Sequence, residues 1–203
     1  MEHFANRITL RGSLKTLPEF SHENHGKRFY RFVLDVPRLS GAVDTLPVVV
    51  QDTLLEQMDL SGGEMIRVEG QIRSHNIQNG DKRKLLIFVF AAGITCDDGE
   101  AVNDVYVEGV LCRHPTYRRT PLGREICDIM LAVKRSCHRS DYLPCILWGR
   151  TAQEISRLEV GDGVCIQGRL QSREYTKVTP EGQECRTTYE ISALCAQTLE
   201  EAI

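Results

Sequence analysis

The sequence contains no run of about 18 uninterrupted apolar residues, the length that a membrane-spanning helix requires. Its first seven residues, Met1 to Arg7, also lack the apolar stretch of a secretory signal peptide. These two absences argue against a membrane protein and against a secreted protein. We therefore expect a cytoplasmic protein with no membrane partner.

Closely spaced cysteine pairs are also missing, although the chain contains eight cysteines. None of them forms the C-x-x-C pair that structural zinc sites usually contain. Cys127, Cys145 and Cys165 lie instead in apolar runs, where a reduced cysteine behaves as a small hydrophobic side chain. We therefore expect no metal site and no cofactor.

Motifs of common enzyme classes are absent as well. The chain has no G-x-x-x-x-G-K-[ST] phosphate loop, no G-x-S-x-G nucleophile turn and no H-E-x-x-H metal site. The histidines fall mostly in expected loops or near the termini, and the Ser21-His22-Glu23 trio is better explained as a polar turn. The sequence therefore predicts a protein that is not an enzyme.

An excess of positive charge is missing too, because the formal net charge is −3. This value argues against an attraction to nucleic acid that extends over the whole chain. It does not exclude binding, since the local distribution of charge matters more than the sum.

An internal repeat is the most informative feature that is present. Residues near the start of the chain match residues 97 positions later, and after one inserted residue the offset becomes 98. The matching glycines and prolines are Gly12 and Gly109, Pro18 and Pro115, Gly26 and Gly123, Pro47 and Pro144, and Gly70 and Gly168. We predict two copies of one fold, over residues 1–97 and 103–199.

Each copy has the pattern of a small β-barrel. In the second copy, strands are expected over residues 105–110, 126–133, 142–148, 164–173 and 187–195. A capping box at residues 151–154, matched by residues 53–56 in the first copy, predicts a short helix between the third and fourth strands. This order predicts an all-β chain of two tandem OB-fold barrels, each a five-stranded Greek key.

The third strand of the second copy contains the first candidate binding residues. Side chains alternate along a strand, so Leu143, Cys145 and Leu147 are expected inside the barrel, and Tyr142 and Trp148 outside it. Exposed aromatic rings suit the stacking of unpaired bases, which contributes about 1–3 kcal/mol per base. The alternative is that Trp148 belongs to the core or to an interface.

Basic residues surround these aromatic positions, and Tyr175 adds a third aromatic side chain after the fourth strand. Such interleaving is typical of surfaces that follow a phosphate backbone while bases stack. The candidate phosphate-contacting residues are Arg118, Arg119, Arg124, Lys134, Arg135, Arg150 and Arg173. Because acidic residues lie among them, solvated loop charge is the alternative.

Four segments of the second copy resemble bacterial single-stranded-DNA-binding proteins: residues 103–109, 115–123, 141–150 and 168–175. The resemblance extends over nearly all of residues 103–197. It implies an OB barrel that commonly dimerises through its first strand. It also implies that the aromatic side chains of Tyr142, Trp148 and Tyr175 stack on DNA bases.

The chain departs from that family in three respects. Family members usually carry one barrel per chain and assemble four, a number that a homodimer of this chain would also reach. Residues 199–203 lack the aromatic-ended acidic tail that recruits partner enzymes, which puts contacts with replication or recombination proteins in doubt. Thr45, Gln51 and Ile77 occupy the three aromatic positions in the first copy, which we expect to supply assembly or weak backbone contact.

The predicted function is sequence-independent binding and protection of single-stranded DNA during replication, recombination or repair. Two alternatives remain open. An OB-fold interaction subunit that no longer binds DNA would suit the negative net charge and the altered first copy. An RNA-binding OB protein would use the same fold, because discrimination of the 2′-hydroxyl cannot be inferred from sequence.

Overall fold

The computed structural model describes residues 5–56, 58–79, 82–135, 139–179 and 182–199. The first half contains β1 (Asn6–Leu14), β2 (Glu19–Asn24), β3 (Lys27–Pro37), β4 (Val43–Gln51), the 3-10 turn η1 (Asp52–Leu54), β5 (Met65–Asn79) and β6 (Lys82–Cys96). The second half contains β7 (Val102–Leu111), β8 (Thr116–Arg119), β9 (Glu125–Lys134), β10 (Ser140–Trp148), α1 (Gly149–Ile155), β11 (Gly163–Thr179) and β12 (Gly182–Thr198).

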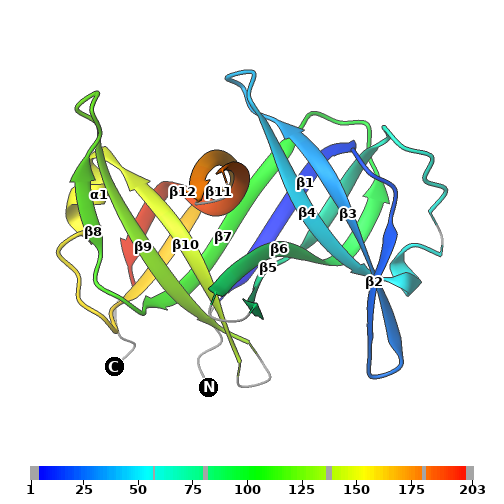
Figure 1. Ribbon diagram of the computed structural model, residues 1–203, viewed down its shortest axis with the longest axis horizontal. Coiled ribbons are helices and arrows are strands. Elements are labelled where there is room, and N and C mark those ends of the chain that lie inside the picture. Colours follow the sequence, from blue (N-terminus) through cyan, green and yellow to red (C-terminus); the bar gives the residue numbers. More distant parts are fainter. Residues whose placement is uncertain (1–4, 57, 80–81, 136–138, 180–181, 200–203) are drawn as a thin grey trace.

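All twelve strands belong to one continuous sheet that curls into two barrels (Figure 1). Its strand order is β2-β3-β4-β6-β5-β1-β7-β11-β12-β10-β9-β8. The additional pairing of β3 with β1 closes the first barrel, and that of β9 with β7 closes the second. The predicted fold class of two tandem OB barrels is confirmed. Within the described residues, no helix has the length and apolar character needed to cross a membrane.

Three local expectations need correction. Each barrel has a short strand, β2 or β8, in addition to the five that were expected. The capping-box prediction is wrong, because α1 begins at Gly149 after Trp148 and no side chain caps it. Among the described residues at the corresponding place in the first barrel, the turn η1 is the one helical element. The two segments have the same apolar spacing but differ in burial: Ala152 and Ile155 of α1 are buried in the second barrel, whereas Leu55 and Met58 are only partly buried.

The barrel interior follows the alternation expected for β10. Leu143, Cys145 and Leu147 are buried, as predicted. Burial raises the pKa of the Cys127 thiol to about 11 and also raises that of Cys145, so both behave as small apolar side chains. Cys165, which was also expected to behave as a small hydrophobic side chain, is only partly buried.

Two of the recurring glycines sit where the two strands of a hairpin approach closely. A Cβ on Gly70 would lie 2.2 Å from the backbone oxygen of Phe90, and one on Gly168 would lie 2.2 Å from that of Ser192. Both glycines adjoin a β-bulge, where the local twist of the hairpin increases. The repeat therefore preserves glycine where any side chain would displace the backbone.

The two barrels are joined edge to edge by their first strands. β1 pairs with β7 in antiparallel register, from Asn6 opposite Val107 to Arg11 opposite Val102. The Asn6 side chain donates to the Ile72 carbonyl at 2.8 Å and accepts from the Ile72 amide at 2.9 Å. Asn103 makes the equivalent two bonds with Leu170. The pairing thus has approximate twofold symmetry.

Two fully buried aspartates lie where the barrels meet. Asp141 is held by the guanidinium of Arg135, which also donates to the Ser74 carbonyl of the first barrel. Asp141 Oδ1 accepts the Ser74 amide at 2.6 Å, and Ser74 Oγ accepts the Tyr142 amide at 2.7 Å. Since a buried charge is costly unless it is paired and hydrogen-bonded, these bonds constrain the interface strongly.

The second aspartate repeats this arrangement with the barrels exchanged. Asp44 is fully buried and paired with Arg38 of the same barrel. Its Oδ1 accepts the Ser172 amide at 2.8 Å, and Ser172 Oγ accepts the Thr45 amide at 2.9 Å. We call Asp44, Asp141 and their bonded partners the reciprocal aspartate contacts.

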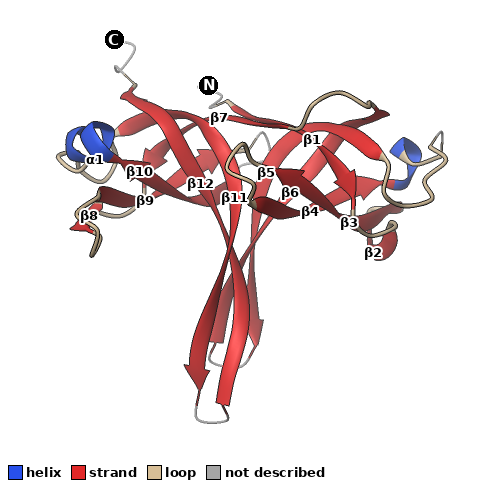
Figure 2. Ribbon diagram, turned by 90° about the horizontal axis from the view of Figure 1, so that it is seen from above, coloured by secondary structure: helices blue, strands red, loops and turns tan. Residues whose placement is uncertain are grey.

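The β5–β6 and β11–β12 hairpins project to the same side of the molecule as two long arms (Figure 2).

Replacing Asp141 by Ala will test this interface. The substitution leaves Arg135 without its carboxylate and the Ser74 amide without an acceptor. Breaking a buried ion pair in this way costs about 3–5 kcal/mol. The free energy of unfolding, measured by urea denaturation, should fall by that amount.

The matched control is Asp128→Asn, which removes the exposed partner of Arg118. An exposed ion pair contributes about 1 kcal/mol or less, so this variant should unfold close to the wild-type midpoint. Equal destabilisation by the two substitutions would contradict the role given to Asp141.

Candidate nucleic-acid interface

The outer surface of the second barrel brings the three predicted aromatic residues onto one face. Tyr142 and Trp148 point outward from β10, and Tyr175 points outward from β11. Their exposed fractions are 42%, 38% and 40%. We call this outward side of β10, β11 and β12 the aromatic face.

Trp148 is held in place on this face by β12. Its indole Nε1 donates to Ser192 Oγ at 3.2 Å, while Ser192 itself is buried. Ile146, the next outward position of β10, pairs with Ser192 in parallel register and is also buried. Strict alternation would have exposed Ile146. The exposed part of the indole is therefore an apolar surface with a fixed position. An exposed fraction of 38% is not that of a core residue, which was one of the alternatives for Trp148.

The face continues from Trp148 along the β11–β12 hairpin. Ser192 lies opposite Arg169, and Tyr175 lies opposite Arg186 in the same ladder. Directly opposed residues share one side of an antiparallel pair, and so do alternate residues along each strand. Trp148 and Tyr175 therefore lie at two ends of one surface, separated by about 20 Å of strand.

Tyr142 lies at the edge that faces the first barrel. Its backbone amide donates to Ser74 Oγ of β5, and it directly follows the buried Asp141. The contacts that join the barrels thus also position this tyrosine.

Most of the predicted phosphate-contacting arginines are ion-paired in the structure. Their partners are Asp128 for Arg118, Glu125 for Arg119, Glu154 for Arg150 and Glu190 for Arg173. The hydrogen bond to Asp128 raises the pKa of Arg118, and the bond to Glu125 raises that of Arg119. All four arginines are more than half exposed, so their charges remain accessible to a ligand.

The other three predicted cations differ from one another. Arg124 makes no ion pair with the described residues, and Lys134 is exposed at the end of β9. Arg135 has a different position from the one expected, because it holds Asp141 and the Ser74 carbonyl between the barrels. The sequence shows Arg135 as a cation in a loop. It does not show that Asp141, six residues later, is buried and ion-paired with it.

Sequence reasoning missed Glu190. It lies on the aromatic face of β12, directly opposite Gln171, and only 13% of its side chain is exposed. Oε1 accepts from Gln171 Nε2 at 2.7 Å and lies 3.6 Å from Arg173 Nε. Alternation along residues 187–195 would have placed it outside the barrel, but only the pairing register shows that it shares a face with Trp148.

In the first barrel the positions of the three exposed aromatic residues carry other side chains, and the outward side of β6 carries the partly buried rings of Phe88 and Phe90 instead. Thr45 Oγ donates to Asp35 at 2.6 Å, Gln51 is partly buried, and Ile77 is exposed on β5. Phe29 and Phe32 of β3 are buried.

Several aromatic rings of β2 and β3 contact one another. His22 stacks on Phe29 with ring centroids 4.9 Å apart, and Phe20 meets Tyr30 edge-on at 6.0 Å. The guanidinium of Arg28 lies 5.7 Å from the Phe20 ring centre and 5.8 Å from that of Tyr30. These rings pack in a cluster and do not form a row along a strand.

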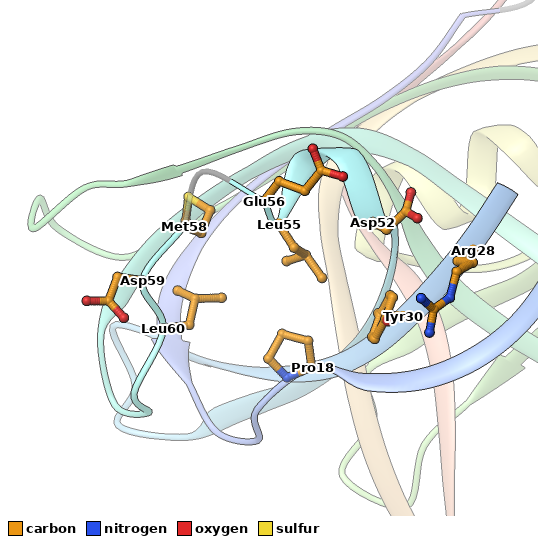
Figure 3. Close-up of a pocket in the computed structure, with 9 residues that line it drawn as sticks. All are labelled: Pro18, Arg28, Tyr30, Asp52, Leu55, Glu56, Met58, Asp59 and Leu60. Carbon is orange, nitrogen blue, oxygen red and sulfur yellow. The ribbon is translucent and has the colours of Figure 1, made fainter.

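An open groove of about 500 Å³ lies beside this cluster (Figure 3). Apolar side chains from the segment after η1, including Leu55 and Leu60, line it together with Tyr30. Asp52, Glu56 and Asp59 also line it, together with Arg28, the one cation among the lining residues. With three carboxylates, the groove is a poor surface for a phosphate backbone, and none of the predicted site residues lines it. Among the described residues, no group of three His, Cys, Asp or Glu side chains could hold a metal ion.

Known proteins resemble the chain most clearly over the second barrel. The single-strand binding protein family matches residues 102–199. The single-stranded DNA-binding protein of Oceanobacillus iheyensis is 32% identical over 108 residues, which are 49% of this chain and 64% of that protein. The chain thus spans less than two thirds of that relative. Single-stranded DNA-binding protein B of Bacillus subtilis is 34% identical over 80 residues, which are 36% of this chain and 71% of the relative.

The resemblance of structures extends over both barrels. A crystal structure of a deletion mutant of the single-stranded DNA binding protein from Thermus aquaticus matches with a TM-score of 0.79 and 25% identity. The match covers 100% of this chain and 98% of that one. The arrangement of two barrels in one chain is therefore shared with a solved structure.

Replacing Ser192 by Ala will test how Trp148 is held. Loss of the bond to the indole nitrogen should lower the free energy of unfolding by about 1 kcal/mol. The indole, now bonded to water, should emit at longer wavelength and be quenched more readily by acrylamide. Trp148 is the only tryptophan, so fluorescence reports on this position alone.

Ser21→Ala in the first barrel is the control, because Ser21 Oγ is exposed and bonds the neighbouring His22 ring at 3.1 Å. Unchanged emission in Ser192→Ala would contradict the proposed support of the indole by β12.

Proposed function

This chain belongs to the single-strand binding protein family, and from that premise we propose that it binds and protects single-stranded DNA without catalysing a reaction. Binding is largely independent of sequence. It serves replication, recombination or repair, in which DNA strands are exposed. Because that DNA lies in the cytoplasm of a bacterium, we also assign the protein to that compartment.

The observation that carries this proposal is the aromatic face. Tyr142, Trp148 and Tyr175 each expose about two fifths of their surface on one side of the second barrel. Bases stacked on these rings would be bound through their π-faces, which every base possesses. This explains how one surface could accept any sequence.

Phosphate contacts would come from the exposed cations around the face. They are Arg118, Arg119, Arg124, Lys134, Arg150 and Arg173, and Arg135 is omitted because it holds Asp141. Four of the six are ion-paired with carboxylates, so phosphate must compete for them. Stacking is therefore expected to contribute more to affinity than charge.

We assign residues 1–97 to the first barrel unit and residues 103–199 to the second. The end of β6 at Cys96 and the start of β7 at Val102 support this division. The first unit, without exposed aromatics at Thr45 and Gln51, would support assembly more than base stacking. A homodimer of the chain would bring four barrels together, and replication or recombination proteins are its candidate partners.

The double substitution of Trp148 and Tyr175 by Ala tests the stacking mechanism. Two lost stacking contacts should weaken binding to a labelled oligo-dT at least about 30-fold, as measured by fluorescence anisotropy. Phe20→Ala, which removes an exposed aromatic ring of the first barrel, should change the affinity little. Unchanged affinity of the double variant would favour a protein-binding role for the face.

The salt dependence of binding tests the contribution of charge. Six free cations would give a slope of about −4 in a plot of log K against log salt concentration. Because four of them are already ion-paired, we expect a shallower slope for this protein. A slope of −4 or steeper, measured with oligo-dT between 50 and 200 mM salt (roughly the range in which counterion release is usually compared), would contradict this reasoning.

A further inference from the structure

The open groove of the first barrel lies at the place where the second barrel has a packed helix. In the second barrel α1 follows β10 and buries Ala152 and Ile155. In the first barrel the turn η1 follows β4, and the segment after it leaves Leu55, Met58 and Leu60 only partly buried. The groove that they line has a volume of about 500 Å³, which is within the range of ligand sites in proteins, about 300–1,000 Å³. The first barrel thus keeps apolar side chains at an open surface where the second barrel encloses them.

Apolar side chains form the middle of the groove. Figure 3 shows Leu55, Leu60 and Pro18 gathered there from two separate segments of the chain. Tyr30 lines the same groove, and Phe20, which is 53% exposed, packs edge-on against it with ring centroids 6.0 Å apart. The apolar surface therefore continues from the groove onto β2. A continuous exposed apolar surface is typical of a contact site for a partner.

Three carboxylates surround this apolar surface without cations of their own. Asp52, Glu56 and Asp59 line the groove, and none of them forms an ion pair with a described residue. Arg28, the one cation among the lining residues, lies instead against two rings of the aromatic cluster, 5.7 and 5.8 Å from their centres. Glu56 and Asp59 are exposed, and Asp52 is partly exposed. All three charges are therefore accessible to a cation from outside the chain.

This combination of charge and apolar surface favours one kind of occupant. The three carboxylates would repel a phosphate backbone, and a purely apolar ligand would leave them unpaired. A peptide segment with apolar side chains flanked by lysine or arginine would satisfy both parts of the groove, because complementary charges favour the correct partner and disfavour others. We propose that the groove binds such a basic, apolar segment of a partner protein. This interaction is additional to the binding of DNA.

DNA and the partner protein would not compete for the same residues. None of the residues proposed to stack on bases or to contact phosphate lines the groove. The first barrel would thus attach a second protein to the DNA that the second barrel holds.

The test uses a phage-displayed library of short random peptides as the probe, selected on the full chain. Enriched peptides are then labelled and titrated by fluorescence anisotropy into the wild-type chain and into the triple variant Asp52→Asn, Glu56→Gln and Asp59→Asn. These substitutions keep the shape of the side chains, so the fold should be retained. We expect the enriched peptides to combine lysine or arginine with large apolar residues. Their affinity for the variant should be about tenfold lower, because three exposed ion pairs are lost.

The matched control is the triple variant Asp98→Asn, Glu100→Gln and Glu159→Gln. It removes the same number of exposed negative charges at positions that do not line the groove. Its affinity for the enriched peptides should equal that of the wild type. A selection that enriches no peptide, or enriches peptides that all three chains bind equally, would overturn this inference.

Two further measurements separate the inference from other roles of the groove. Light scattering should give the same mass for the wild type and the groove variant, since a changed mass would assign the groove to contacts between copies of this chain. The groove variant should also bind oligo-dT at least as tightly as the wild type, since weaker binding would assign the groove to the DNA surface. Either contrary result overturns the inference. A wild-type chain that binds the enriched peptides but not oligo-dT would instead support the inference and overturn the proposed function.

Discussion

The reciprocal burial of Asp44 and Asp141 is the constraint on which the arrangement of the molecule depends. Each carboxylate is paired with an arginine of its own barrel and accepts an amide of the other, and Asp141 also lies 3.5 Å from Arg73 of the opposite barrel. Neither barrel alone can satisfy its aspartate, and an unsatisfied buried charge is costly. The β1–β7 pairing joins the two barrels, and the aspartates restrict their relative orientation because hydrogen bonds tolerate little change in distance or angle.

This constraint reaches the aromatic face through the chain itself. Tyr142 follows Asp141 directly, and its amide is bound by Ser74 of the opposite barrel. Ser172, whose amide donates to Asp44, lies on β11, the strand that also carries Arg173 and Tyr175. Elements that hold the barrels together thus position two of the three exposed aromatic residues. Separating the barrels would be expected to disturb the face even without any change to an aromatic side chain.

Much of the fold could be predicted because its signals are local. The offset of 97 or 98 residues matched glycines such as Gly70 and Gly168, and the structure explains them by contacts that exclude a Cβ. Alternation along 142–148 separated Leu143 and Leu147, which are buried, from Tyr142 and Trp148, which are exposed.

What could not be predicted depends on contacts between distant segments. No local pattern shows that Arg135 binds a buried carboxylate and a carbonyl of the other barrel. Ile146 is buried because β12 runs beside it, which only the sheet order reveals. The position of Glu190 beside Gln171 likewise requires the register of β11 and β12.

A net charge of −3 is compatible with binding single-stranded DNA if the affinity does not come mainly from charge. Four of the proposed phosphate-binding arginines already have carboxylate partners, so transferring one of them to a phosphate exchanges one ion pair for another. Stacking on Tyr142, Trp148 and Tyr175 has no such competitor, because their exposed rings face solvent. In such a surface the carboxylates suppress indiscriminate attraction to polyanions, duplex DNA included. The strand that binds is then selected by its unpaired bases, which a duplex keeps stacked within itself.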